Sequence, residues 1–234
     1  MPIKFSLIVP TYNEKTSLLE LYSKLVCVLS PLSFDFEIIF VDDNSPDMTW
    51  RIAEDLAKND KRVRVIRRMH QRGLASAVIS GWVSAQGEIL GVIDADLQHP
   101  PEVLSEMLGR ILRDNEVDIV IASRYVAGGR VLDQSLWQVI KSRLAILSGL
   151  ILIPQIFKSV KDPLSGYFIL RKKIIEIDQL SPIGYKILLE VLAKCTYKKV
   201  VELPFVFTQR ERGKSKADWK QCFLSLFHFL RLKY

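Results

Sequence analysis

The sequence has few cysteines and lacks the usual glycine-rich phosphate loops. Its 234 residues include three cysteines, Cys27, Cys195 and Cys222, which are too few and too scattered for a disulfide framework or a zinc site. A reducing compartment fits this usage. No G-x-G-x-x-G turn follows the first strand-like segment, and no G-x-x-x-x-G-K-[ST] segment occurs. These absences exclude the common dinucleotide-binding and P-loop classes.

Long apolar runs and tracts of biased composition are also absent. Residues 1–4 lead directly into a strand-like segment, without the apolar region of a cleaved secretory signal. The uncharged residues 144–157 are shorter than the roughly 20 residues that a membrane-spanning helix needs, and could lie in an interface or in a core. The net charge of +7 favours anionic partners. Without a zinc finger, an RNA-binding aromatic signature or a long basic tract, we expect no nucleic-acid ligand.

Apolar strand-like runs alternate with segments of helical periodicity. Strands are expected at residues 5–9, 36–41, 63–66, 89–93 and 119–122, and helices at residues 14–29, 49–58, 74–85 and 101–115. This alternation predicts an α/β domain with a mostly parallel, doubly wound sheet and helices on both faces. We expect its core to be fully specified by about Arg124. Further strand-like runs at 167–170 and 200–207 and a helical segment at 185–194 follow.

The C-terminal residues carry an apolar face at helical spacing. Its members are Trp219, Cys222, Phe223, Leu226, Phe227 and Leu230. We therefore expect a catalytic domain at residues 1–216 and an amphipathic helix at 217–234. Two positions for this helix stay open, docking on the core and lying on a membrane surface. A longer parent chain with membrane-spanning helices also stays open.

Two carboxylates one residue apart follow the apolar run at residues 89–93. Asp94 and Asp96, with Gln98 close behind, would emerge at the carboxyl edge of the sheet, where open α/β sheets bind ligands. Oxygen ligands of this kind suit Mg²⁺ or Mn²⁺, which bind one or two carboxylates together with substrate phosphates. The motif thus predicts a metal-bound phosphorylated substrate. The alternative is that both aspartates cap the helix introduced by Pro100 and Pro101.

Seven segments together resemble the family 2 glycosyltransferases, and more closely the polyprenyl-phosphate glycosyltransferases of the dolichyl-phosphate mannose synthase type. They are residues 10–14, 41–46, 94–100, 123–125, 141–143 and 162–166, and Arg210 with residues 213–216. Each segment alone is weak, but all seven occur in the family order and span nearly the whole chain. The resemblance implies a Rossmann-like GT-A fold.

On the donor side, the resemblance implies a nucleotide-sugar site. The residues that would contact the donor are Pro10, Tyr12, Glu14, Val41, Asp43, Asp94, Ala95, Asp96, Arg210 and Lys216. Asp94, Asp96 and Gln98 would hold Mg²⁺ or Mn²⁺, and Arg210 and Lys216 would close over the diphosphate. Two alternatives stay open: Asp43 as a turn cap, and the basic loop as an ordinary solvated loop.

On the acceptor side, the resemblance implies a cationic clamp for a lipid phosphate, formed by Arg124, Ser142 and Arg143. The sequence departs from the family at Gln138, where members commonly carry Arg; Arg130 or Lys141 could compensate. Asp162 is carried over as a base or acceptor-positioning group, with a turn role set by Pro163 as the alternative. The expected catalytic residues are Asp96, Arg124 and Asp162.

The resulting hypothesis is a metal-dependent, inverting transfer of a hexose, mannose or glucose, to a polyprenyl phosphate, dolichyl or undecaprenyl. The donor would be GDP-mannose or UDP-glucose. The reaction would occur at the cytoplasmic face of a membrane, with the chain peripheral or anchored by segments beyond it. Two alternatives are a family 2 enzyme with a saccharide acceptor and a noncatalytic nucleotide-binding module that recruits a membrane partner. The Gln-x-x-Arg-Trp signature of processive polysaccharide synthases is absent.

Overall fold

The computed structural model describes residues 3–132, 136–181, 184–208, 227 and 229–232. The strands are β1 Phe5–Thr11, β2 Phe36–Asp42, β3 Val63–Arg67, β4 Ile89–Val92, β5 Val117–Ser123, β6 Arg130–Val131, β7 Phe168–Arg171, β8 Lys199–Pro204 and β9 Val206–Phe207. The α-helices are α1 Leu18–Leu29, α2 Thr49–Asn59, α3 Leu74–Ser84, α4 Val103–Arg113, α5 Leu136–Leu152, α6 Pro154–Ser159 and α7 Ile187–Lys194. Two short 3₁₀ turns, Lys172–Ile174 and Ile177–Gln179, lie between β7 and α7.

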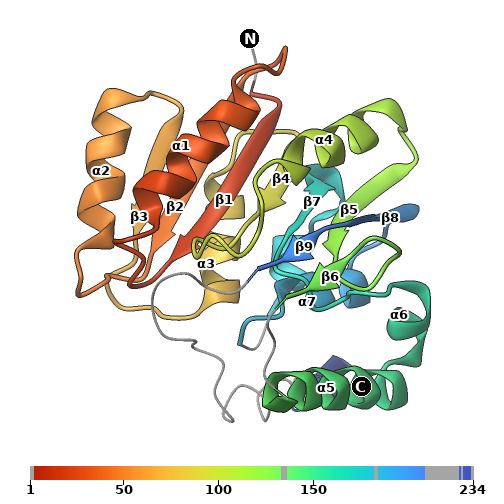
Figure 1. The fold of residues 1–234 in the computed structure, drawn as a ribbon. Helices are drawn as coiled ribbons and strands as arrows, with labels where there is room; N and C mark the ends of the chain where they lie inside the picture. Colours follow the sequence, from red (N-terminus) through yellow and green to blue (C-terminus); the bar gives the residue numbers. More distant parts are fainter. Residues whose placement is uncertain (1–2, 133–135, 182–183, 209–226, 228, 233–234) are drawn as a thin grey trace.

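One seven-stranded sheet, in the order β3-β2-β1-β4-β7-β5-β8, forms the centre of the molecule (Figure 1). β1 pairs in parallel with β2 and β4, β2 with β3, and β5 with β8. β7 is antiparallel to both β4 and β5. The carboxyl ends of β1, β2, β4 and β5 therefore lie at one edge of the sheet, which is where ligands bind in this architecture.

Helices cover both faces of the sheet, as the sequence predicted (Figure 1). α1, α2 and α4 pack on one face over a core that includes Phe5 and Phe40. α3, α6 and α7 pack on the other face over a core that includes Ile8 and Phe168. α3 comes especially close to β1 because Gly81 has no side chain; a Cβ there would lie 2.7 Å from Ile8 Cγ1. Strands buried on both faces explain the nearly continuous apolar runs of the sequence.

The predicted strands and helices of the first half are confirmed to within a few residues. α1 is the largest departure, because it begins at Leu18 instead of residue 14. Residues 14–17 form a turn in which the Ser17 amide donates to the Glu14 carbonyl at 3.1 Å. The expectation that the core would be complete by Arg124 was wrong. β7 enters the sheet between β4 and β5, and β8 adds the outer strand beyond β5.

The apolar stretch at residues 144–157 is divided between two environments. Leu144, Leu147, Leu150 and Ile151 on α5 are exposed, whereas Ile153, Ile156 and Phe157 at α6 are buried. Pro154 at the first turn of α6 starts a new helix at this point. Among the described residues no helix is both long and apolar enough to span a bilayer.

Most of the predicted C-terminal helix at 217–234 lies outside the described residues. In the part that is described, Phe229 is buried and packs edge-on against Phe157, with ring centroids 5.8 Å apart. Arg231 donates to the Ser181 carbonyl at 3.0 Å. This short segment therefore docks on the protein, while Phe227 and Leu230 are exposed.

Candidate functional site

The end of β2 carries two adjacent aspartates with different tasks. Asp42 stabilises the turn: its carboxylate accepts from the Ser45 amide at 2.8 Å and from the Thr11 hydroxyl at 2.9 Å. Asp43 accepts instead from Arg68 Nε at 2.7 Å and from the Gly73 amide at 2.8 Å. The residue that caps the turn is thus Asp42 and not Asp43. Asp43 forms a buried ion pair with Arg68, in the loop after β3.

The other predicted nucleoside residues surround the same corner of the sheet. Pro10 and Val41 are buried neighbours across the β1–β2 pairing. The Glu14 amide donates to Thr49 Oγ1 at 3.0 Å, which ties the turn after β1 to the start of α2. The ring of Tyr12 is partly exposed and lies 5.1 Å from the guanidinium carbon of Arg72. The structure therefore brings Pro10, Tyr12, Glu14, Val41 and Asp43 together at one end of the edge.

The acidic pair follows β4, at the middle of the same edge. Asp94 and Asp96 are partly exposed, and the Asp96 carboxylate accepts from the Gln98 amide at 3.2 Å. Between them and Gln98, Leu97 has a left-handed backbone conformation with φ of 63°, a costly geometry for a side chain of this kind. α4 begins later, at Val103, without a side-chain cap. The alternative that these aspartates cap that helix is therefore wrong.

Gln98 and the buried backbone of Ala95 complete this loop. Gln98 Nε2 donates to the Thr208 carbonyl at 2.9 Å, which joins the acidic loop to the residue after β9. Ala95 is 4% exposed. On its other side the loop touches Gly166, where a Cβ would lie 2.8 Å from Asp94 Oδ2. Gly166 of the segment 162–166 therefore lies directly against Asp94, and a side chain there would displace the Asp94 carboxylate.

His99 is buried immediately behind the acidic pair. Its Nδ1 lies 3.8 Å from Asp94 Oδ2, and its ring packs against Tyr167, Phe205 and Phe207 at centroid distances of 5.3–5.5 Å. Burial, and secondly the positive charge of Arg124, lower the pKa of His99 to about 3. The imidazole is therefore neutral at physiological pH.

Arg124 and Asp162 form a second buried ion pair at the end of β5. Arg124 donates through Nε at 2.8 Å and Nη2 at 2.7 Å to the two carboxylate oxygens, and its backbone amide adds a third bond at 3.0 Å. Asp162 is fully buried, whereas the Arg124 side chain is 20% exposed. Burial opposes the charge of Arg124, but the hydrogen bonds and negative charge of Asp162 outweigh it, so the pKa of Arg124 is raised. Arg124 also interacts electrostatically with Asp94.

The remaining predicted acceptor residues lie on α5 or outside the described residues. Ser142 Oγ and the Tyr125 hydroxyl are 2.8 Å apart, and the Tyr125 ring lies 5.3 Å from the Arg124 guanidinium carbon. This contact brings Ser142 close to Arg124. Arg143 is exposed on α5. Arg210 and Lys216 lie outside the described residues, so their predicted role over the diphosphate stays a prediction.

The residues present fit a divalent ion that is carried by a diphosphate. Asp94 and Asp96 are partly exposed and occupy one loop, leaving the other ligand positions of Mg²⁺ or Mn²⁺ to phosphate oxygens and water. Within the described part of the chain, no three His, Cys, Asp or Glu side chains are grouped as a metal site. These residues therefore suit a metal shared with a substrate better than a metal held by protein ligands alone.

Sequence reasoning missed two residues of this edge. Arg68 and Arg72 follow β3 and contact Asp43 and Tyr12, respectively. His99 was considered as a residue behind the metal ligands but was given no catalytic role. Arg68 and Arg72 are two of 33 basic residues, and no pattern in the sequence distinguishes them. Only the pairing of β2 with β3 brings Arg68 to Asp43.

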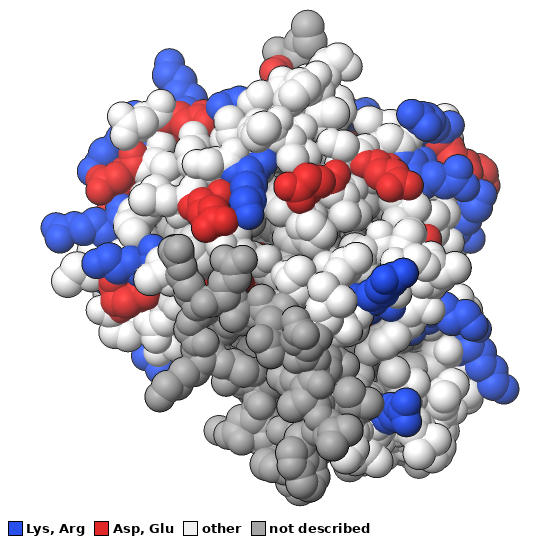
Figure 2. Space-filling model, viewed as in Figure 1, with Lys and Arg blue, Asp and Glu red and all other residues white. Residues whose placement is uncertain are grey.

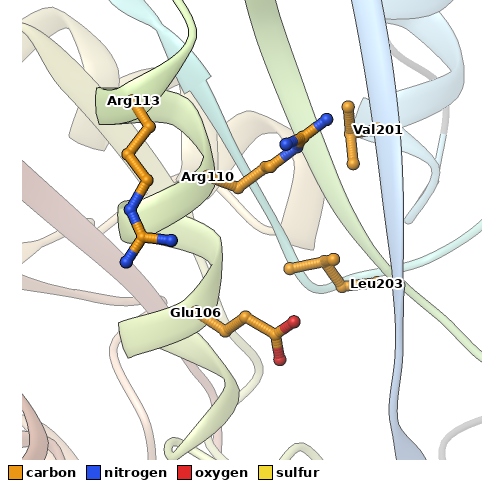
Figure 3. Close-up of a pocket in the computed structure, with 5 residues that line it drawn as sticks. All are labelled: Glu106, Arg110, Arg113, Val201 and Leu203. Atoms are coloured by element: carbon orange, nitrogen blue, oxygen red, sulfur yellow. The ribbon is translucent and has the colours of Figure 1, made fainter.

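A hollow elsewhere on the surface contains none of the predicted site residues. It is lined by Glu106, Arg110 and Arg113 on α4 and by Val201 and Leu203 on β8 (Figure 3). Arg110 points towards β8 across this hollow (Figure 3). Its shape alone gives no reason to place a substrate there, whereas the carboxyl edge combines acidic, cationic and aromatic groups.

The fold and the edge together are those of an α/β protein that binds its ligand where parallel strands end. A known protein of the same fold is glucosyl-3-phosphoglycerate synthase from Mycobacterium tuberculosis, solved in complex with Mn²⁺, UDP-glucose and phosphoglyceric acid. It matches with a TM-score of 0.69 at 17% identity, over 99% of this chain and 79% of that chain. At this identity the likeness shows the fold only.

The sequence comparisons give the family. The model of glycosyl transferase family 2 matches residues 6–177, and the chain belongs to this family of glycosyltransferases. It is 47% identical to a dolichol-phosphate mannosyltransferase of Pyrococcus furiosus over 98% of this chain. It is 36% identical to a dolichol-phosphate mannosyltransferase of Saccharomyces cerevisiae over 94% of this chain. The chain spans 64% of the Pyrococcus protein and 83% of the yeast protein.

Proposed function

We propose that this chain transfers a hexose, mannose in the first place, from a nucleotide-diphosphate sugar to a dolichyl or related polyprenyl phosphate, with inversion. The observation that carries this proposal is the 47% identity, over 98% of the chain, to a protein named dolichol-phosphate mannosyltransferase. The geometry agrees with it, because the edge of the sheet presents an acidic pair for a donor and a cation for an acceptor close together.

On the donor side, the residues divide between nucleoside and diphosphate. The corner of Tyr12 and Asp43 would hold the base and ribose, with Arg68 keeping the Asp43 carboxylate in place. Asp94 and Asp96 would hold Mg²⁺ or Mn²⁺, which when bound stabilises the charge of the departing nucleoside diphosphate. GDP-mannose is the proposed donor, with UDP-glucose as the competing one. A structure of the same fold that contains Mn²⁺ and UDP-glucose supports this general arrangement.

On the acceptor side, the chain has to orient a nucleophile that is already activated. A phosphate monoester has a second pKa near ~6, so it is largely dianionic at neutral pH. Arg124 would attract and orient it, with Ser142 and Arg143 completing the clamp. Because Asp162 is fully buried and engaged by Arg124, its proposed task is to fix that guanidinium. Attack in line with the leaving diphosphate inverts the anomeric centre, and correct positioning supplies much of the rate.

The surface of α5 supports association with a membrane. Ile140, Leu144, Leu147 and Ile151 follow helical spacing and are 45–68% exposed. Residues 136–159 contain basic residues but no Asp or Glu, and the lower right of Figure 2, around α6, shows blue and white atoms without red. An apolar stripe with basic neighbours suits the surface of a bilayer with anionic lipids. We propose peripheral contact at the cytoplasmic face of a membrane.

The direct test is transfer of labelled sugar by the purified chain with Mg²⁺ or Mn²⁺. GDP-mannose, UDP-glucose and dolichyl or undecaprenyl phosphate are supplied in all combinations, and label is measured in the organic extract. We expect mannose transfer to dolichyl phosphate to be the fastest. Absence of extractable label from every donor would refute the lipid acceptor and favour a saccharide acceptor.

A matched pair of variants tests the acidic motif. Asp96→Asn should abolish metal-dependent transfer while leaving thermal unfolding nearly unchanged, because Asp96 is partly exposed. Asp47→Asn, at the turn before α2, removes a carboxylate of the same edge that accepts from Thr49, and should retain transfer. Full activity of Asp96→Asn would contradict the metal assignment.

A further inference from the structure

His99 is a buried side chain with an unused polar atom aimed at the acidic pair. The residue is 4% exposed, and its Nδ1 is buried with no hydrogen-bond partner among the described residues. Asp94 Oδ2 lies 3.8 Å from it. This separation is slightly too long for a hydrogen bond. Buried polar atoms without a partner are rare in folded proteins, so each one needs an explanation.

The ring is held firmly in this orientation by three aromatic side chains. Tyr167, Phe205 and Phe207 enclose it at centroid distances of 5.4, 5.5 and 5.3 Å. A phenylalanine would fill the same apolar enclosure without burying a nitrogen. Packing alone therefore does not explain why the enclosed ring is an imidazole.

The Asp94 carboxylate lies close to both this imidazole and Gly166. A Cβ at Gly166 would lie 2.8 Å from Asp94 Oδ2, the same oxygen that faces His99. The absence of a side chain at Gly166 leaves room for this carboxylate oxygen beside the imidazole. A shift of the carboxylate towards the ring by less than about 1 Å would form a hydrogen bond of ordinary length.

We propose that His99 is a positioning residue: it donates its Nδ1–H to Asp94 Oδ2 and so fixes the orientation of the carboxylate that would hold the divalent ion. The inference rests on the proposed function, which assigns a metal to Asp94. A neutral imidazole carries one N–H, and a carboxylate opposite Nδ1 favours the tautomer with the proton on Nδ1. Hydrogen bonds to ligating carboxylates orient them and strengthen metal binding.

The test is Mn²⁺ affinity, measured on the full chain by electron paramagnetic resonance of the free aquo ion. His99→Phe keeps the packing and removes the donor, and its dissociation constant for Mn²⁺ should rise about tenfold or more. His99→Asn places an amide N–H close to the position of Nδ1, and should recover to within about threefold of the wild type. His99→Gln carries its amide one bond further out and should stay weak. Thermal unfolding identifies variants that fail to fold. If His99→Phe fails to fold, the comparison of His99→Asn with His99→Gln decides the question.

Phe205→Leu is the matched packing control. It loosens the same enclosure without touching a polar atom, so its Mn²⁺ affinity should stay within about twofold of the wild type while its thermal midpoint falls. Equal Mn²⁺ affinities of His99→Phe and the wild type would overturn the proposal. Weak Mn²⁺ binding by Phe205→Leu would also overturn it, as would a Mn²⁺ affinity of His99→Asn no higher than that of His99→Gln. If the wild-type chain binds no Mn²⁺ even with GDP present, the proposed metal is wrong. That outcome differs from a metal that binds equally well to the wild type and to His99→Phe.

Discussion

Two buried aspartate–arginine pairs stand at opposite ends of the same sheet edge, and they differ in which partner reaches solvent. In the first, Arg68 and Asp43 have side chains that are 5% and 8% exposed. In the second, Arg124 is 20% exposed and Asp162 is completely buried. In the first pair both charged groups are thus buried, and neither charge is presented to solvent. The second presents a cation to its surroundings and keeps the carboxylate inside.

The origin of the partners explains this difference. Asp43 ends a strand and its arginine comes from the neighbouring strand end, so both are locked into the regular parallel sheet. Arg124 also follows a strand, but Asp162 comes from the irregular segment before the antiparallel β7. An aspartate from such a segment can reach beneath the arginine and leave its outer edge accessible. The same type of ion pair can therefore be buried as a whole or can expose its arginine. The outcome depends on the backbone segments from which the two partners come.

The largest effect is expected from Arg124→Met. This change leaves the fully buried Asp162 without its cationic partner, so the free energy of unfolding should fall by about 3–5 kcal/mol. The measurement is urea unfolding, extended to Asp162→Asn and the double variant. The double variant should lose less than the sum of both single changes, because it has no uncompensated charge. Strict additivity would show that the two side chains do not act as a pair.

A smaller loss is expected from Arg68→Met at the first pair. Asp43 keeps the Gly73 amide as a donor and is slightly exposed, so the loss should be about 1–3 kcal/mol. Urea unfolding under the same conditions gives the direct comparison with Arg124→Met. If Arg68→Met proves the more damaging of the two, exposure of the carboxylate does not control the cost.

Gly166→Ala tests the contact between the segment of Asp162 and the acidic pair. The added methyl group would lie 2.8 Å from Asp94 Oδ2, so the carboxylate has to turn away. We expect a stability loss of about 1 kcal/mol together with a clear loss of metal-dependent transfer. Gly109→Ala in α4 is the control, because a Cβ there meets nothing closer than 3.9 Å. It should raise stability by up to about 1 kcal/mol through helix propensity and leave transfer unchanged.

The smallest effect concerns Asp60, whose partner Arg62 is 39% exposed. Hydrogen bonds from Arg62 lower the pKa of Asp60 to about 2. Because the folded-state pKa is depressed, the stabilisation is present above the unfolded value near ~4 and is lost as pH falls from there towards 2. Asp60→Asn should cost about 1 kcal/mol or less at pH 7 and less still at pH 2.5. Thermal unfolding at both pH values is the check. Asp55→Asn is the control, because the ion pair of Asp55 with Lys58 is highly exposed, and it should not change stability measurably.

The first half of the fold could be read from the sequence because its signals are local. Strand, turn and helix alternate in residues 5–113, each with its own periodicity, and parallel neighbours follow from that alternation. β7 shows the limit. Its apolar run was recognised, but a run of four buried residues contains no information on direction or on neighbours. Its antiparallel place between β4 and β5 is set by the path of the intervening α5 and α6.

Some residues of the candidate site could likewise be predicted from the sequence, and others could not. Motifs at strand ends, such as Asp94 to Gln98, were found because residue type and position in a predicted sheet suffice to identify them. Arg68 was not found, and His99 was given no catalytic role, because the task of each depends on a contact across the fold. The roles of Arg210 and Lys216 stay predictions, since both lie outside the described residues.

The sequence by itself determined the alternation of elements, the edge at which chemistry-bearing residues gather and the family to which they point. The tertiary structure decided which of two adjacent aspartates holds a turn and which meets an arginine, and which member of each ion pair is exposed. The physical reason is that periodicity and turn chemistry act over a few neighbouring residues. Burial and charge pairing, in contrast, depend on chain segments that only packing brings together.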